Sequence, residues 1–410
     1  MNNPRPVQKA LDDALPELLA CARVLVDIEQ VSTFDADTRV LAQDVVSALQ
    51  VPPQDNSSMD GYALRCADVA SAGALLNLSQ RIPAGASGSE VLAGTAARIF
   101  TGAPIPPGAD AVVMQEDCEL VGDTPVVRVN AVPQKGQWIR SAGEDVTRGA
   151  VVLARGQRLT PAELGLAASI GMDRLAVVRR PRVALFSTGD ELVMPGDVAP
   201  RDMAPGAIYN SNRFFLRALL RRLGCEVTDL GIVPDQRAAT VQALQRASLA
   251  HDLVLTSGGV SVGEEDHIKP AVTSLGQLDL WQIAIKPGKP FAYGRIGPAH
   301  FIGLPGNPVS SFVTFVLLVR PFLLRLQGVV DVAPRAVAVR ADFDWPRADR
   351  RREFLRVRRN AAGGLDLFAN QSSGVLTSAV WGDGLLDNPA GATIARGDLV
   401  RFIPFSDLLS

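Results

Sequence analysis

Between residues 181 and 326, short apolar segments alternate with amphipathic ones, and this alternation constrains the fold more than any other feature of the chain. Residues 183–186 (VALF) are a continuous apolar run, and residues 252–256 (DLVLT) are a second predicted strand with an apolar centre, as in strands that are buried on both faces of a parallel sheet. Residues 211–223 and 237–249 space their apolar side chains as helices do. The pattern predicts an α/β domain built on a doubly wound parallel sheet. The other elements expected here are strands at 227–232, 279–285 and 291–293, a strand around Phe301, and a helix at 310–326 that Pro321 kinks or ends.

The texture of the sequence changes on either side of this region. From residue 32 to 146 glycine and proline are frequent and apolar runs are short, which favours a mostly β structure. After Gly328 short strands alternate with turn signals, as in a small β-barrel. We therefore expect a multidomain α/β protein. Its predicted parts are a discontinuous helical or linker domain (1–28 with 147–179), a β-rich domain (29–146), an α/β domain (180–328) and a C-terminal small β-barrel (329–410).

A helix over residues 161–170 is predicted from its end signals. Thr160 can cap its N-terminus, Glu163 completes a capping box, and Gly171 ends it. We expect this helix to pack against a second one predicted within residues 5–30.

Composition narrows the class of function. The net charge of −2 argues against a nucleic-acid-binding protein, which usually has a basic face. The four cysteines are scattered without a CxxC pair and the three histidines form no ligand motif, so a reducing compartment is expected. Without a signal peptide or a run of 18 or more apolar residues, we expect a cytoplasmic protein that does not enter a membrane. A basic cluster at 347–359 fits a solvated turn as well as part of a site.

Four glycine-containing loops follow the predicted strands of the α/β domain, at 187–191, 257–266, 286–290 and 304–310. Ligands of such sheets bind beyond the carboxyl ends of the strands. Glycines let backbone N–H groups approach a phosphate, and a following helix adds its positive end. One such loop alone is explained by chain turning, whereas four in one domain favour a phosphorylated ligand. Fixed charges in or near these loops include two lysines and four acids that suit Mg²⁺: Lys286, Lys289, Asp190, Glu191, Asp235 and Asp266.

No Walker A, GxSxG or HExxH motif occurs, so a P-loop ATPase, a serine hydrolase of the usual type and a zinc protease lose support. The β-rich region has polar clusters of its own at 55–62, 99–106 and 143–145, each of which also fits a surface turn.

Taken together, these motifs resemble those of the MoeA family of molybdopterin molybdenumtransferases, and the resemblance covers nearly the whole chain. The matching stretches include QDNSSMDGYALR (54–65), RIFTGAPIPPGADAVVMQE (98–116), AGEDV (142–146), RPRVALFSTGDELV (180–193), IYNSNR (208–213), DLVLTSGGVSVGEEDH (252–267), IKPGKPFAYG (285–294), GLPGNPVSSF (303–312) and QSSGVLTSAVWGDGLL (371–386).

The resemblance implies a set of functional residues. Catalytic roles fall on Asp60, Thr101, Asp145, Glu191, Asp235, Asp266 and Lys286. Substrate binding falls on Ser187, Thr188, Gly189, Ser257, Gly258, Gly259, Ser261, Lys286, Pro287, Lys289, Gly306, Asn307, Ser310 and Arg351, and Mg²⁺ binding on Asp266, Glu191 and Asp190. One position departs from the pattern, because Gln282 follows Trp281 where many relatives carry a lysine. Lys289 or Arg351 could replace that positive charge.

The resemblance also implies a reaction, in which adenylyl-molybdopterin and molybdate give molybdenum cofactor and AMP with Mg²⁺ support. It implies a homodimer with the active cleft between subunits, an upstream molybdopterin adenylyltransferase, and downstream molybdoenzymes or chaperones. Three alternatives stay open at the level of sequence: a tungstate-specific insertase, an adenylyltransferase, and a scaffold that has kept the fold without the chemistry.

Overall fold

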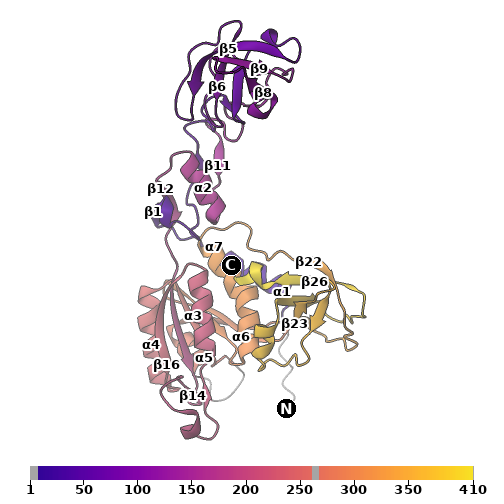
Figure 1. Cartoon of the computed structure of the whole chain (residues 1–410). Helices are drawn as coiled ribbons and strands as arrows, with labels where there is room; N and C mark the ends of the chain where they lie inside the picture. Colours follow the sequence, from indigo (N-terminus) through magenta and orange to yellow (C-terminus); the bar gives the residue numbers. More distant parts are fainter. Residues whose placement is uncertain (1–7, 261–266, 410) are drawn as a thin grey trace.

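The computed structural model describes residues 8–260 and 267–409. The molecule is elongated, with a β-rich domain at one end and the α/β and C-terminal domains side by side at the other (Figure 1). A small unit between them contains α2 (Pro161–Ser169), β1 (Ile28–Ser32) and β12 (Arg174–Val178). This architecture confirms the expected multidomain fold with a β domain at the C-terminus.

The α/β domain is built on a six-stranded sheet in the order β16-β13-β17-β21-β20-β18. Neighbouring strands pair in parallel from β16 to β21, whereas β20 runs antiparallel to both of its neighbours. Only residues 297–298 separate β20 from β21, and a connection this short joins antiparallel strands. The strands are β13 (Arg182–Thr188), β16 (Glu226–Val233), β17 (Leu253–Ser257), β18 (Gly276–Gln282), β20 (Pro290–Ile296) and β21 (Ala299–Leu304).

Helices cover both faces of this sheet, as the doubly wound pattern predicts. One core contains α3 (Asn212–Arg222) together with α6 (Pro308–Thr314) and α7 (Arg320–Leu326). The other contains α4 (Arg237–Ala250) and α5 (Ile268–Leu275). The short strands β14 (Leu192–Val193) and β15 (Ile208–Tyr209) pair beyond the end of β13.

Residues 308–326 form one long apolar helix at the centre of the larger core. By length and hydropathy this helix could cross a membrane, but 94% of its apolar 18-residue window is buried inside the fold, and a helix apolar on every side is typical of such a position. Pro321 does not end it. A π-helical segment, Phe315–Val319, precedes α7, and Pro321 lies in the first turn of α7, where a missing N–H costs least.

The N-terminal helix α1 (Leu11–Cys21) joins the same core through Leu11, Ala14 and Leu18. The capping box at Thr160 is confirmed, but α2 belongs to a separate core. The predicted packing of these two helices is therefore wrong. The single apolar stripe of α1 is buried against α7, so no second face remains for α2.

The two β domains have six-stranded sheets. The β-rich domain has the order β7-β4-β6-β5-β9-β8, with β4 (Gly61–Leu64), β5 (Ala74–Ile82), β6 (Thr95–Ile99), β7 (Ala111–Met114), β8 (Cys118–Leu120) and β9 (Val126–Val129). The C-terminal sheet has the order β19-β23-β25-β26-β22, with β24 beside β23. Its strands are β19 (Ile285–Lys286), β22 (Val337–Arg340), β23 (Arg352–Arg359), β24 (Leu365–Leu367), β25 (Gly384–Asn388) and β26 (Leu399–Pro404). Because β19 lies between β18 and β20 in the chain, this sheet ties the α/β and C-terminal domains together.

Candidate functional site

A cavity of about 550 Å³ lies at the carboxyl ends of β13, β17 and β21, where the glycine loops were predicted to meet. The loops after these three strands all contribute to its wall, so the structure brings together residues from distant parts of the sequence. The predicted site residues that line it are Thr188, Glu191, Ser257, Gly258, Gly306 and Asn307.

Glycine is required where two of these loops touch. Gly258 has a φ of +94°, and a Cβ built on it would lie 2.8 Å from the carbonyl oxygen of Thr188. Gly259 has a φ of +66°, and its Cβ would lie 2.5 Å from the side chain of Ile268. A side chain at Gly258 would push its loop away from the end of β13, and one at Gly259 would push the same loop away from α5.

Two asparagines that the sequence analysis did not assign also line this cavity. The side-chain amide of Asn212 donates to Ser257 Oγ over 2.8 Å and to the carbonyl of Gly306 over 2.7 Å, so it fixes two loops at once. Asn212 Oδ1 and Asn210 Nδ2 are buried without a partner among the residues that the structure describes. Buried polar atoms are normally paired, so these two offer an acceptor and a donor to a ligand. The only signal in the sequence was the stretch IYNSNR.

A second pocket of about 320 Å³ lies between the α/β domain and the C-terminal domain, and Asn307 lines both cavities. Its cations are Lys286, Lys289 and Arg351, and its hydroxyls come from both domains. The predicted residues that line it are Lys286, Pro287, Lys289, Asn307, Ser310 and Arg351. The loop of Gln371, Ser372 and Ser373, which had no predicted role, completes the wall. Cations and hydroxyls around a small hollow suit an oxyanion.

Carboxylates of the C-terminal domain hold the cations of this pocket in place. Lys286 Nζ lies 2.9 Å from Glu353 Oε1 and 3.1 Å from Asp349 Oδ2. Arg351 binds Asp349 through Nε and Nη2, each over 3.1 Å. Partial burial works against the charge of Lys286, but the bonds to Glu353 and Asp349 outweigh it and raise its pKa. The hydrogen bonds from Arg351 hold the pKa of Asp349 well below its usual range.

Gln282 lies at the end of β18, opposite Pro290, and does not line the second pocket. Its Oε1 is buried without a partner in the described part of the chain. The two residues named as replacements for the expected lysine, Lys289 and Arg351, do line the pocket.

The predicted metal ligands are only partly brought together. Glu191 lines the first cavity. Asp190 instead accepts a hydrogen bond from the backbone N–H of Asp235 over 3.4 Å, and neither Asp190 nor Asp235 lines the first cavity or the second pocket. Asp266 and Ser261 lie outside the described residues. Within residues 8–260 and 267–409, no group of three His, Cys, Asp or Glu side chains is arranged to hold a metal ion.

Asp60 and Thr101 meet in the β-rich domain. The backbone N–H of Thr101 and its hydroxyl both donate to Asp60 Oδ1 over 2.8 Å, and these bonds lower the pKa of Asp60. Asp145 lies on the neighbouring loop and bonds through its backbone N–H to Val51. The β-rich domain and β14, which marks the carboxyl end of β13, lie at opposite ends of the molecule (Figure 1). Within one chain these residues therefore do not reach the two pockets.

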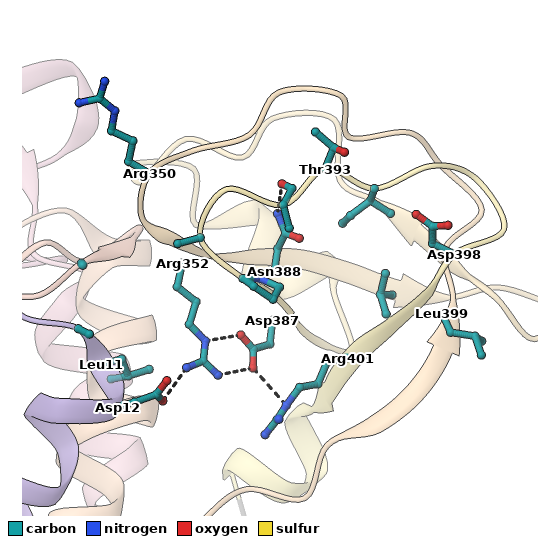
Figure 2. A pocket seen from close by; sticks show the side chains of 17 residues that line it. Leu11, Asp12, Arg350, Arg352, Asp387, Asn388, Thr393, Asp398, Leu399 and Arg401 are labelled. Atoms are coloured by element: carbon teal, nitrogen blue, oxygen red, sulfur yellow. Dashed lines mark hydrogen bonds and ion pairs between the residues drawn. The ribbon is translucent and has the colours of Figure 1, made fainter.

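A third cavity, of about 780 Å³, is formed by α1 together with the β25–β26 part of the C-terminal domain, and none of the predicted site residues line it. Figure 2 shows Arg352 at its centre, bonded to Asp12 over 2.8 Å and to both carboxylate oxygens of Asp387 over 2.5 and 2.6 Å. Arg401 adds a contact of 3.2 Å to Asp387. The arginines and aspartates at this position thus form ion pairs with one another, as expected where α1 packs against the C-terminal domain.

Three family descriptions match the chain: "MoeA N-terminal region (domain I and II)" over residues 6–171, "Probable molybdopterin binding domain" over 184–325, and "MoeA C-terminal region (domain IV)" over 338–405. The chain is 44% identical over 318 residues to the molybdopterin molybdenumtransferase of Haemophilus influenzae, covering 78% of each protein. It is 37% identical to molybdopterin molybdenumtransferase 2 of Mycobacterium tuberculosis, covering 94% of this chain and 95% of that one. The solved structure of a molybdopterin biosynthesis protein from Pyrococcus horikoshii OT3 is similar, with a TM-score of 0.84 and 29% identity over 97% of this chain and 100% of that one.

Proposed function

Since this chain belongs to the MoeA family of molybdopterin molybdenumtransferases, we propose that it inserts molybdenum from molybdate into adenylyl-molybdopterin and releases AMP. The observation that carries the proposal is the pair of cavities joined at Asn307. One is walled by the glycine loops that suit phosphate groups, and the other holds the cations Lys286, Lys289 and Arg351 that suit an oxyanion.

The chemistry needs charge neutralisation more than a nucleophile, because cleavage of a phosphoanhydride develops negative charge on oxygen. No cysteine or histidine is among the residues that line either cavity, which fits this requirement. The sulfur ligands of molybdenum belong to the substrate.

Mg²⁺ assists at the first cavity in this proposal. Glu191 is the described carboxylate there, and Mg²⁺ commonly takes one or two carboxylates together with substrate phosphates and water. When bound, the ion neutralises phosphate charge.

The active unit is a homodimer in which the β-rich domain of one subunit completes the site of the other. The separation of Asp60 and Thr101 from the two cavities within one chain supports this arrangement. Exposed apolar side chains near β1 also support self-association: Val26 is 86%, Ile28 59% and Phe34 94% exposed.

The test is AMP release from adenylyl-molybdopterin by the purified protein, with and without molybdate and Mg²⁺. We expect AMP and a molybdenum-loaded product only when molybdate is present. Absence of molybdate-dependent AMP release would contradict the proposal, and consumption of ATP with free molybdopterin would instead identify an adenylyltransferase.

A further inference from the structure

Glu353 is a buried carboxylate that lies directly behind the oxyanion pocket without lining it. It is 1% exposed, and the parallel pairing of β19 with β23 places it beside Lys286. Its Oε1 accepts from Lys286 Nζ over 2.9 Å, while its Oε2 accepts from Trp345 Nε1 over 2.8 Å and from Asn388 Nδ2 over 3.3 Å. Three N–H donors therefore surround the two carboxylate oxygens of Glu353, and these bonds include no acceptor.

This arrangement uses most of the hydrogen-bonding capacity of the lysine. An ammonium group has three N–H donors, and Glu353 and Asp349 take two of those of Lys286. One donor is left for a ligand in the pocket.

The same carboxylates set the charge around the pocket. The cations that line it are Lys286, Lys289 and Arg351. Asp349 binds both Lys286 and Arg351, and Glu353 binds Lys286, so the two carboxylates offset two of these three charges.

We propose that Glu353, assisted by Asp349, limits the affinity of the pocket for its oxyanion, so that the oxyanion is delivered to the reaction instead of being retained. This inference rests on the proposed function of the pocket. Tight binding of a substrate in its ground state lowers KM without raising kcat, so a carboxylate that weakens ground-state binding favours turnover. Neither carboxylate touches the oxyanion, and both act through Lys286.

The test is the Glu353→Gln variant of the full-length protein, titrated with sodium molybdate by isothermal calorimetry. The change removes a negative charge. Glutamine has a single acceptor oxygen, and when that oxygen accepts from Trp345 and Asn388, its NH₂ group faces Lys286 and cannot accept a hydrogen bond from it. We expect the Kd for molybdate to fall by about tenfold, with a lower kcat for AMP release at saturating substrate. Tighter binding cannot result from a damaged fold, so this readout separates the proposed role from a structural one.

Asp349→Asn gives a second route, because Asp349 is less buried and also holds Lys286. It should tighten molybdate binding in the same direction, which keeps the inference testable if Glu353→Gln does not fold. Asp342→Asn is the matched control: it removes a carboxylate from the same domain that pairs with Arg340, and molybdate binding should not change.

The outcomes separate the two proposals. If the wild-type protein binds no molybdate, the proposed function fails. If the wild type binds molybdate and the folded variants bind it equally or more weakly, the role assigned to Glu353 is overturned.

Discussion

Thr101 donates both its backbone N–H and its hydroxyl to a single oxygen of Asp60, each over 2.8 Å. The pair is solvent-exposed and belongs to the β-rich domain, which lies at the opposite end of the molecule from β14 (Figure 1). We predict that Asp60→Ala lowers molybdate-dependent AMP release by about 10²-fold, the scale on which loss of a catalytic acid or base commonly reduces a rate. The melting temperature should stay close to that of the wild type because the side chain is exposed, and circular dichroism can verify this.

A complementation experiment tests whether Asp60 acts across a dimer. Asp60→Ala and Lys286→Ala would each be inactive, but a heterodimer of the two contains one site with neither change. Random exchange of subunits should therefore restore about a quarter of wild-type activity. If the mixture stays inactive after exchange has been verified by mass spectrometry, the two residues do not act across such a dimer.

Arg352 joins α1 to the C-terminal domain through Asp12 and Asp387 (Figure 2). The Asp387 side chain is 2% exposed, and Arg352→Ala would leave that carboxylate with Arg401 as its remaining ion-pair partner. We predict a loss of about 3 kcal/mol in the free energy of unfolding, the usual scale for breaking a buried ion pair. Urea unfolding measures it, with Arg340→Ala, an exposed ion pair of the same domain, as a control expected to lose less than about 1 kcal/mol. Equal losses in the two variants would show that the ion pair of Arg352 with the buried Asp387 stabilises the fold no more than an exposed ion pair does.

The sequence was sufficient to predict which loops of the α/β domain meet. Ser257 and Gly306 follow different strands, yet both line the first cavity, because the carboxyl ends of parallel strands share one edge of a sheet. Lys286 and Ser310 were both predicted to bind substrate, and both line the second pocket.

The contributions of other domains could not be predicted from local pattern. Ser372 and Ser373 reach the pocket because β19 pairs with β23, and pairing between distant strands leaves no local signal. Likewise, the apolar spacing of α1 indicates that one face is buried but does not indicate which partner covers it. Asp60 carries no signal of its distance from the cavities, which depends on how the domains are arranged along the molecule.

His300 predicts how stability depends on pH. It is 6% exposed, Tyr293 lies 2.9 Å from its Nδ1, and burial, helped by Arg295, lowers its pKa from 6.5 to about 4. A lowered pKa means that the folded state favours the neutral form of His300. The contribution of His300 to the free energy of unfolding is therefore complete above pH 6.5 and is lost as the pH falls towards 4. The loss should be about 3 kcal/mol. Urea midpoints at a series of pH values should fall more steeply for the wild type than for His300→Gln, which does not titrate; parallel curves would refute the assignment.

Gly288 gives a test of the shape of the oxyanion pocket. Its φ is +115°, and a Cβ at this position would lie 2.5 Å from Thr314 Oγ1 on α6. Gly288→Ala should therefore displace the loop that carries Lys286 and Lys289. We expect molybdate binding to weaken by at least about tenfold, which corresponds to a loss of about 1.4 kcal/mol of binding free energy. Gly297→Ala is the matched control, because Gly297 also has a positive φ, +56°, but its Cβ would meet nothing within 4 Å. Both variants bear a backbone cost of about 1–2 kcal/mol, so both should lose some stability, and calorimetric titration with molybdate distinguishes them. If Gly288→Ala binds molybdate as well as Gly297→Ala does, the close contact with Thr314 does not shape the pocket.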